Sequence, residues 1–335
     1  MNWSSGFSAE YYASIVDPNT WRDINRFEIT GGSITRNDSE LRESADIECL
    51  NYTEVTEQWI RIWLNAKQGN DTAHIALFTG LTSTPSRNIN GRIVNTPIQC
   101  YSVLKPAQDV LLDRGWYVPA DMDGAKAVEQ LLKVVNLPID YYKEEVKLLS
   151  SAIIAEDGET HLSMAEKILE AIDWDIFISG DGSIYLGPYE IESTAIFDSI
   201  NNDIVEKSLT INYDWFDCPN VFRAIVDNVY AIARDDDPNS SFSTVSRGRE
   251  IWAEETNCDL NQNETIGEYA QRKLNEKQNI LRSISYSRRF DPNVNVYDVI
   301  TLSYPEQNIF GTFRVRNQTI ELGHGARTSE EVIQI

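Results

Sequence analysis

Histidine, cysteine and methionine are scarce in this 335-residue chain, which contains three, four and three of them. The cysteines are far apart and form no CxxC pair. This spacing argues against a zinc site and predicts buried free thiols in a reducing compartment. The four positions are Cys49, Cys100, Cys218 and Cys258.

Basic residues are also few, with 29 Lys and Arg against 52 Asp and Glu and a formal net charge of −23. Nucleic-acid binding by phosphate neutralisation needs clustered basic residues, so the charge argues against it. From Glu156 to Glu206, thirteen acidic residues accompany one basic residue, Lys167. This stretch is either a solvated face or the wall of a passage that a polyanion crosses without adhering.

No apolar run approaches the roughly 20 residues that a membrane-spanning helix needs. The first 20 residues lack the basic start and apolar centre of a secretory signal, so we expect synthesis in a cytosol. The 41% of hydrophobic residues suffices for packed cores, and the length predicts two or three domains.

The stretch from Phe27 to Asn65 has the apolar–polar alternation of a half-buried antiparallel sheet. Similar alternation continues towards residue 110, and Arg87–Gly91 has the composition of a polar hairpin tip. Residues 1–110 are therefore predicted to form one β-rich domain.

Helical periodicity replaces this alternation after Pro106. Asp123–Asn136 is predicted as an amphipathic helix that Asp121 or Asp123 caps. A second helix is expected to start at Ser163, with Glu166 completing a capping box.

Two apolar stretches around Asp181-Gly182 predict a β-hairpin over Asp175–Gly187. Together with the two helices, this hairpin makes residues 111–206 a predicted α+β domain.

Strand patterns return in residues 207–335. They cover Ser208–Tyr213 and one continuous alternation over Asn220–Ala233, while Thr265 and Glu268 offer a capping box for a helix ending near Asn279. The tail after Gly323 is expected to be loose. Three closing strands are predicted at Ile284–Arg288, Val299–Leu302 and Gly311–Leu322.

The histidines and the acidic run 235–237 specify no catalytic or metal site. His74 lies in a predicted strand without a partner carboxylate, His161 precedes a helix cap, and His324 is near the end of the chain. Asp235-Asp236-Asp237 lacks the alternating ligands of an EF-hand, so a solvated loop is favoured.

Two other patterns are also too weak to assign an activity. Asp173 and Asp175, with Glu190 and Glu192, could form a glycosidase pair, but nothing in the sequence indicates a sugar cleft. The glycines lack phosphate-binding spacing. We therefore predict no catalytic residue, cofactor or metal ligand.

Bacteriophage tail baseplate hub proteins, the group that includes phage late control protein D, resemble this chain in three regions. Their N-terminal strand region resembles ITGGSITRNDSELRESADIECLN, and the start of their inserted domain resembles the helix at Asp123–Asn136. Their C-terminal barrel resembles NETIGEYAQRKLNEKQN and FDPNVNVYDVITLSYPEQNIFGTFRVRNQTIEL, although Tyr297 stands where glycine is usual.

The resemblance implies a β-rich α+β fold with two tail-tube-like β-barrel domains, 1–110 and 207–335, flanking an inserted α+β domain, 111–206. Three chains would form a homotrimeric ring that adapts the hexameric tail tube to a threefold tip, spike or fibre. DNA would pass through an acidic lumen without specific binding. The tape measure protein is a further candidate partner.

Such a protein would be a structural component of the virion tail baseplate, assembled in the bacterial host cytoplasm. Contractile tails, non-contractile tails, bacteriocins and other contractile injection systems stay open. Two other functions also stay open: a peptidoglycan hydrolase, and a receptor- or carbohydrate-binding tail-tip protein that uses Trp59, Trp63 or Trp116. Interface residues are expected on polar-tipped strands, at Arg36, Arg42, Arg87, Asn88, Asn90, Arg314, Arg316 and Asn317.

Overall fold

The computed structural model divides the chain into two compact units. Unit 1 consists of Met1–Leu209, Ser285–Ile333 and Ile335, and unit 2 consists of Thr210–Ile284 and Gln334. Strands dominate the secondary structure, which confirms the predicted β-rich class. The structure describes residues 1–50, 52, 56–84, 88–90, 93–142, 146–189, 192–198, 205–212, 215–226, 229–256, 258, 264–278, 282–323 and 326–335.

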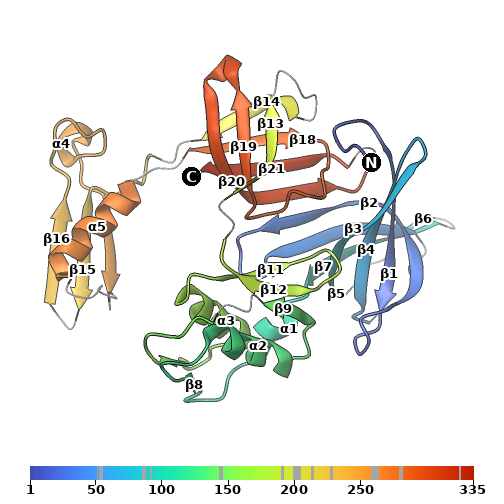
Figure 1. Ribbon diagram of the computed structural model, residues 1–335, viewed down its shortest axis with the longest axis horizontal. Helices are drawn as coiled ribbons and strands as arrows, with labels where there is room; N and C mark the ends of the chain where they lie inside the picture. The colour runs from blue at the N-terminus through green and yellow to red at the C-terminus, as the bar shows by residue number, and fades with distance from the viewer. Residues whose placement is uncertain are drawn as a thin grey trace. The chain divides into compact units, whose positions relative to one another are not determined.

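The N-terminal part of unit 1, here called the first β region, is built from antiparallel strands (Figure 1). The pairing order is β1-β4-β5-β7-β3-β2, and β1 also pairs with β2, so the pairings return to the first strand. The alternation predicted from Phe27 to Asn65 is confirmed, because Ile34, Ile47 and Ile62 all point into one core. The strands are β1 (Ser8–Val16), β2 (Asp23–Asn37), β3 (Glu43–Leu50), β4 (Trp59–Gln68), β5 (Asp71–Thr82), β6 (Asn88–Asn90) and β7 (Ile93–Ser102).

The next part of unit 1, here called the insert, has its own core of helices and short strands. The predicted hairpin is confirmed, since β11 and β12 pair antiparallel around Gly182, whose φ is +89°. β12 also pairs in parallel with β9. The elements are α1 (Lys105–Asp109), β8 (Tyr117–Val118), α2 (Gly124–Val134), β9 (Ile139–Tyr142), β10 (Ile153–Ile154), α3 (His161–Glu170), β11 (Asp175–Ile178) and β12 (Ile184–Gly187).

The helices of the insert begin at side-chain caps, one of them not where the sequence predicted. Asp123 caps α2 by accepting a hydrogen bond from the backbone N–H of Ala125. The predicted start of α3 at Ser163 is wrong, because Thr160 is the N-cap. Ser163 completes the capping box, since its hydroxyl accepts from the Thr160 N–H as a glutamate would. His161 therefore lies inside the helix, buried, rather than before its cap.

The strands that follow the insert, here called the second β region, continue the sheet. They belong to unit 1 except for a few terminal residues of β14, β18 and β21, which fall in unit 2. The pairing order of the second β region is β13-β19-β20-β21-β18-β14, and β20 also pairs with β2 of the first β region. The expected loose tail after Gly323 is wrong, because it contains β21, in which Thr328, Glu330 and Val332 are buried. The strands are β13 (Ser193–Asp198), β14 (Val205–Asn212), β18 (Ser283–Arg288), β19 (Val299–Tyr304), β20 (Ile309–Glu321) and β21 (Thr328–Gln334), with a 3-10 turn, η1, at Pro305–Gln307.

Unit 2 is a three-stranded sheet, ordered β16-β15-β17, whose core includes the apolar side of one helix, α5. The alternation predicted as continuous over Asn220–Ala233 is wrong, because β15 and β16 form an antiparallel pair. When apolar–polar alternation resumes directly after the chain reverses direction, two strands have the sequence pattern of one long strand. The capping box of Thr265 and Glu268 is confirmed. The elements are β15 (Val221–Val226), β16 (Val229–Arg234), α4 (Thr244–Arg247), β17 (Trp252–Thr256) and α5 (Ile266–Gln278).

All four cysteines are buried free thiols, as predicted. Among the described residues, no helix combines the length and the apolar composition that crossing a membrane requires.

Candidate functional site

The first β region, the insert and the second β region meet around the hairpin of β2 and β3. Arg36, near the end of β2, lies opposite Glu43, the first residue of β3. The hairpin closes through a hydrogen bond from the Asn37 N–H to the Arg42 carbonyl (2.8 Å). Arg42 has a φ of +63°, a left-handed conformation that side chains other than glycine rarely adopt.

Arg36 connects β2 to three other segments. Its Nη1 donates to Asn295 Oδ1 (2.9 Å) and to Gln318 Oε1 (3.1 Å), and its Nη2 donates to the Leu77 carbonyl (2.5 Å). Its side chain is only 12% exposed. Arg36, predicted as a contact with other chains, is therefore used inside this one.

Gln318 extends these contacts into the core of the second β region. Its Nε2 donates to Glu330 Oε1 (2.9 Å). Glu330 also accepts from Arg288 Nη2 (2.6 Å) and Nε (2.9 Å), and from the Tyr286 hydroxyl (2.6 Å). The side chains of Arg288 and Glu330 are fully buried, and both carboxylate oxygens of Glu330 accept hydrogen bonds.

Sequence reasoning missed this cluster. The sequence places an arginine and a glutamate at inward positions of two strands. That the two side chains pair can be inferred only when the two strands are known to be neighbours.

Arg42 connects the hairpin to the insert. Its Nη2 donates to Asp175 Oδ1 (2.6 Å) and Glu166 Oε1 (3.2 Å), and its Nη1 donates to the Tyr297 hydroxyl (2.9 Å). Asp175, one of the carboxylates considered for a glycosidase pair, is buried and forms an ion pair with Arg42. Burial raises the pKa of Glu166 to about 7, while Arg42 opposes the rise.

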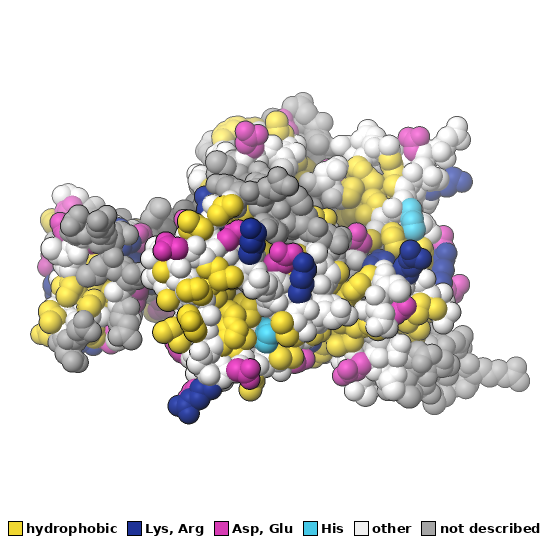
Figure 2. Space-filling model, turned by 60° about the horizontal axis from the view of Figure 1, so that its bottom comes forward, with side chains coloured by type: hydrophobic (Ala, Val, Ile, Leu, Met, Phe, Trp, Pro, Cys, Tyr) yellow, Lys and Arg dark blue, Asp and Glu magenta, His cyan; other side chains and the backbone are white. Residues whose placement is uncertain are grey.

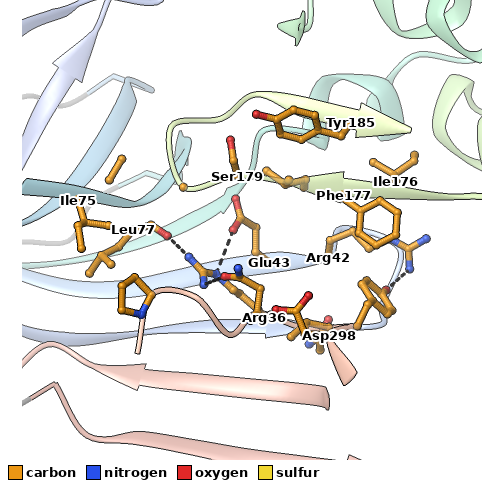
Figure 3. A pocket seen from close by; sticks show the side chains of 18 of the residues that line it. Arg36, Arg42, Glu43, Ile75, Leu77, Ile176, Phe177, Ser179, Tyr185 and Asp298 are labelled. Atoms are coloured by element: carbon orange, nitrogen blue, oxygen red, sulfur yellow. Dashed lines mark hydrogen bonds and ion pairs between the residues drawn. The ribbon is translucent and has the colours of Figure 1, made fainter. Parts of the chain in front are cut away.

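A cavity of about 390 Å³ lies between these elements (Figure 3). At its polar end are Arg36, Glu43 and Asp298, from the hairpin and the segment before β19. Apolar side chains also line the cavity. They belong to Ile75, Leu77, Ile178, Phe290, Pro292 and Val296.

Glu43 is a buried acid in this cavity. It is 4% exposed, and its Oε2 lies 3.8 Å from Arg36 Nε. Burial raises the pKa of Glu43 to about 8, although Arg36 lowers it. Within the described part of the chain, neither Glu43 Oε1 nor Arg36 Nε has a hydrogen-bond partner.

The remaining predicted interface residues lie in the second β region or outside the described side chains. The Arg314 guanidinium lies over the Tyr189 ring (4.9 Å), and Arg316 Nε pairs with Asp38 Oδ2 (2.8 Å). Asn317 lies opposite Asn37 where β20 pairs with β2. Arg87 and the side chains of Asn88 and Asn90 lie outside the described residues.

The tryptophans predicted for a carbohydrate site pack against other groups. Trp59 contacts Trp21 edge-on (5.1 Å between ring centroids), and Trp63 stacks on His74 (4.2 Å). Trp116 is partly buried against the core of the insert.

The other weak candidates make local contacts. Asp235 Oδ2 accepts from the Ser240 hydroxyl (2.6 Å) in the loop before α4. His324 and Glu190 lie outside the described residues, and Glu192 is exposed. No group of three potential metal ligands occurs among the described residues.

Part of the surface of the insert is apolar. Figure 2 shows one face of the molecule, on which apolar side chains lie between scattered acidic and basic ones. Apolar surface that is contiguous and exposed marks contact sites for other proteins. The insert exposes Leu111, Tyr117, Val134, Leu148 and Ile154.

Several known structures share the fold of this chain. No protein-family model matches the chain, and no curated protein matches it either. A tail protein from Neisseria meningitidis has 12% identity and a TM-score of 0.69, over 98% of this chain and 97% of that one. The 43 kDa tail protein of prophage MuSo2 from Shewanella oneidensis has 12% identity and a TM-score of 0.68, over 98% of both chains.

A component of the E. coli type VI secretion system, described as structurally similar to T4 bacteriophage tail proteins, also shares the architecture. It has 9% identity and a TM-score of 0.52, over 92% of this chain and 74% of that one. The chain therefore has the fold of phage tail proteins, which confirms at the level of the fold the resemblance predicted from its sequence.

Proposed function

We propose that the chain is a structural hub of a phage tail or tail-like baseplate. Three copies form a ring that adapts the sixfold tail tube to a threefold tip, spike or fibre. The observation that carries this proposal is the likeness to two phage tail proteins over nearly the whole chain. The proposed role is mechanical, without catalysis.

The arrangement of the strands supports a doubled architecture. The six strands β1, β2, β3, β4, β5 and β7 have pairings that return to their start, and β20 joins them to a second set of strands. We propose that both sets are tube-like barrels, the first in domain 1–110 and the second in domain 207–335 around the insert 111–206, with β13 and the start of β14 added to the second barrel from the end of the insert. Three such chains offer six barrels, which is the number that a sixfold tube requires.

Charge supports a role for the ring as a passage. A chain with a net charge of −23 can line a lumen through which DNA moves without adhering, because like charges repel. The proposed partners are the tail tube ring above, the tip or spike protein below, and the tape measure protein. The proposed location is the tail baseplate of a virion or a related particle.

The predicted interface residues divide into two groups under this proposal. Arg36 and Arg42 affect assembly indirectly, by fixing the β2–β3 hairpin through contacts inside the chain. Arg316, which is 49% exposed, contacts a neighbouring chain directly. Asn317 and the segment at 87–90 are proposed for the same direct role.

Native mass measurement of the purified chain, alone and with its tail tube protein, tests the proposal. The expected species contains three copies of the 38.1 kDa chain. A species that stays monomeric at high concentration and with the tube protein present contradicts the hub. A low-resolution image of the intact particle then shows whether the ring lies between tube and tip.

A further inference from the structure

The cavity beside Arg36 and Glu43 combines buried polar atoms that lack partners with an apolar wall. Glu43 is 4% exposed, and its Oε1 accepts no hydrogen bond from any described residue. Arg36 Nε is likewise without an acceptor within hydrogen-bond distance in the described chain. Figure 3 shows the Glu43 carboxyl group between Arg36 and Ser179, inside the lining of the cavity.

Leaving such atoms unpaired is costly. A buried donor or acceptor that has lost water and gained no partner keeps the full cost of its desolvation. The 3.8 Å gap between Arg36 Nε and Glu43 Oε2 also exceeds a direct hydrogen bond. A group that donates to Glu43 and accepts from Arg36 would satisfy both atoms at once.

The size and lining of the cavity fit a small organic group. Its volume of about 390 Å³ falls within the roughly 300–1,000 Å³ range of small-molecule sites. Leu77 and Phe290 in its lining are buried, so an occupant gains by placing a hydrocarbon body against them.

The charges around the cavity favour a neutral occupant. Arg36 repels a cation, whereas Asp298, which accepts a hydrogen bond from the Asn295 N–H (2.8 Å), repels an anion. A carboxylate would suit the site only with Glu43 protonated, and an ammonium only with Glu43 ionised. An amide has a donor and an acceptor, so it suits Glu43 and Arg36 in either state.

We propose that this cavity is a binding site for a neutral carboxamide carried on an apolar body, with the amide N–H donating to Glu43 Oε1 and the amide oxygen accepting from Arg36 Nε. The inference is independent of the proposed hub function. The amide belongs either to a small molecule or to a peptide segment of a neighbouring protein, and the experiment below separates these sources.

Three probes of the same shape and different charge test the proposal: benzamide, benzoate and benzamidinium. Binding to the full chain is measured by ligand-observed NMR titration at about pH 6 and about pH 9, below and above the pKa of about 8 to which burial raises Glu43. Benzamide is expected to bind at both pH values. Benzoate should bind at least about tenfold more weakly than benzamide at the higher pH, and benzamidinium at least about tenfold more weakly at the lower pH, a difference of about 1.4 kcal/mol. Loss of benzamide binding at either pH, or tighter binding of one charged probe at both, overturns the proposal. Binding of no probe also overturns it.

Two variants locate the bound probe. Glu43→Ala is expected to weaken benzamide binding at least about tenfold, since it removes the acceptor. Glu48→Ala, an exposed position on the same strand, is the control and should leave the Kd unchanged. Equal binding by wild type and Glu43→Ala overturns the assignment. Should Glu43→Ala fail to fold, Ile178→Trp, another residue of the lining, narrows the cavity and must abolish binding.

A fourth probe, N-acetylphenylalanine amide, separates the two sources. Binding of this probe together with benzamide assigns the cavity to a peptide segment. Binding of benzamide alone assigns it to a small molecule.

Discussion

In the described part of unit 1, two buried arginine–glutamate pairs differ in how completely their hydrogen bonds are formed. Arg288 and Glu330 lie 2.6 Å apart with fully buried side chains, and Tyr286 and Gln318 complete the hydrogen bonds of the carboxylate. Arg36 and Glu43 are also almost completely buried, but Arg36 Nε and Glu43 Oε2 are 3.8 Å apart.

The difference shows that burial alone does not define what an ion pair does. A buried pair whose hydrogen bonds are complete holds strands in one arrangement, and removing one partner leaves an uncompensated charge. A loose pair beside a cavity retains free hydrogen-bonding capacity. The first pair therefore stabilises the second β region, and the second pair marks the site proposed for ligand binding.

Glu330→Gln is expected to have the largest effect on stability. It leaves the Arg288 guanidinium buried without a counter-charge, which costs roughly 3–5 kcal/mol of unfolding free energy. Urea unfolding measures the change. The control is Glu206→Gln, because the Arg327–Glu206 pair is 47% and 43% exposed and its loss should cost less than about 1 kcal/mol. Similar losses of unfolding free energy in the two variants would show that the buried pair contributes no more to stability than the exposed pair.

Arg42→Ala is expected to rank second, at about 3 kcal/mol, because it leaves the buried Asp175 without its cation. Amide hydrogen exchange should show the loss most strongly in α3, which carries Glu166. Arg42→Gly removes the same contacts but relieves the left-handed backbone, so it should be about 1 kcal/mol more stable than the alanine variant. If the alanine and glycine variants have the same unfolding free energy, the left-handed backbone at Arg42 does not reduce stability.

Glu43→Gln is expected to change the pH dependence of stability more than stability itself. Between pH 4.5, the ordinary pKa, and about pH 8, folded Glu43 keeps a proton that the unfolded chain has released. The folded state then binds more protons, so this residue lowers the unfolding free energy by about 1.4 kcal/mol per pH unit as pH rises. The dependence vanishes below and above that window.

The difference in unfolding free energy between Glu43→Gln and wild type should therefore increase from pH 5 to pH 8. Near pH 5 the two proteins should agree within about 1 kcal/mol, since both carry a neutral side chain. Glu48→Gln, at an exposed position on the same strand, is the control for the substitution itself. A difference that stays constant or falls with pH would show that Glu43 is ionised throughout.

Local patterns predicted most of the elements, and pairing between distant strands explains most of the errors. Alternation located β2, β3 and β4, and the turn at Gly182 located the insert hairpin, because these signals are carried within about ten residues. The prediction of a loose tail after Gly323 is wrong because a glutamate in the sequence is typical of an exposed position. Glu330 is buried only because Arg288, 42 residues away, pairs with it.

The candidate site was partly visible in the sequence. Arg36 and Arg42 were singled out as polar residues at the end of a hairpin, but their partners come from β20, the insert and the segment before β19. Glu43 was not singled out, since its perturbed pKa arises from burial that only the folded chain creates. Sequence periodicity says which side a residue faces and not which residues meet there.

Arg316→Glu is expected to have the smallest effect on folding. Its pair with Asp38 is 49% and 42% exposed, so its loss should change the unfolding free energy by no more than about 1 kcal/mol. Assembly should respond differently, because a direct contact with a neighbouring chain would meet a reversed charge. Native mass measurement should show less of the three-copy species, while Arg327→Glu, an exposed arginine outside the predicted interface, serves as the matched control. Unchanged assembly in Arg316→Glu would remove this residue from the interface and leave the pair with Asp38 as its role.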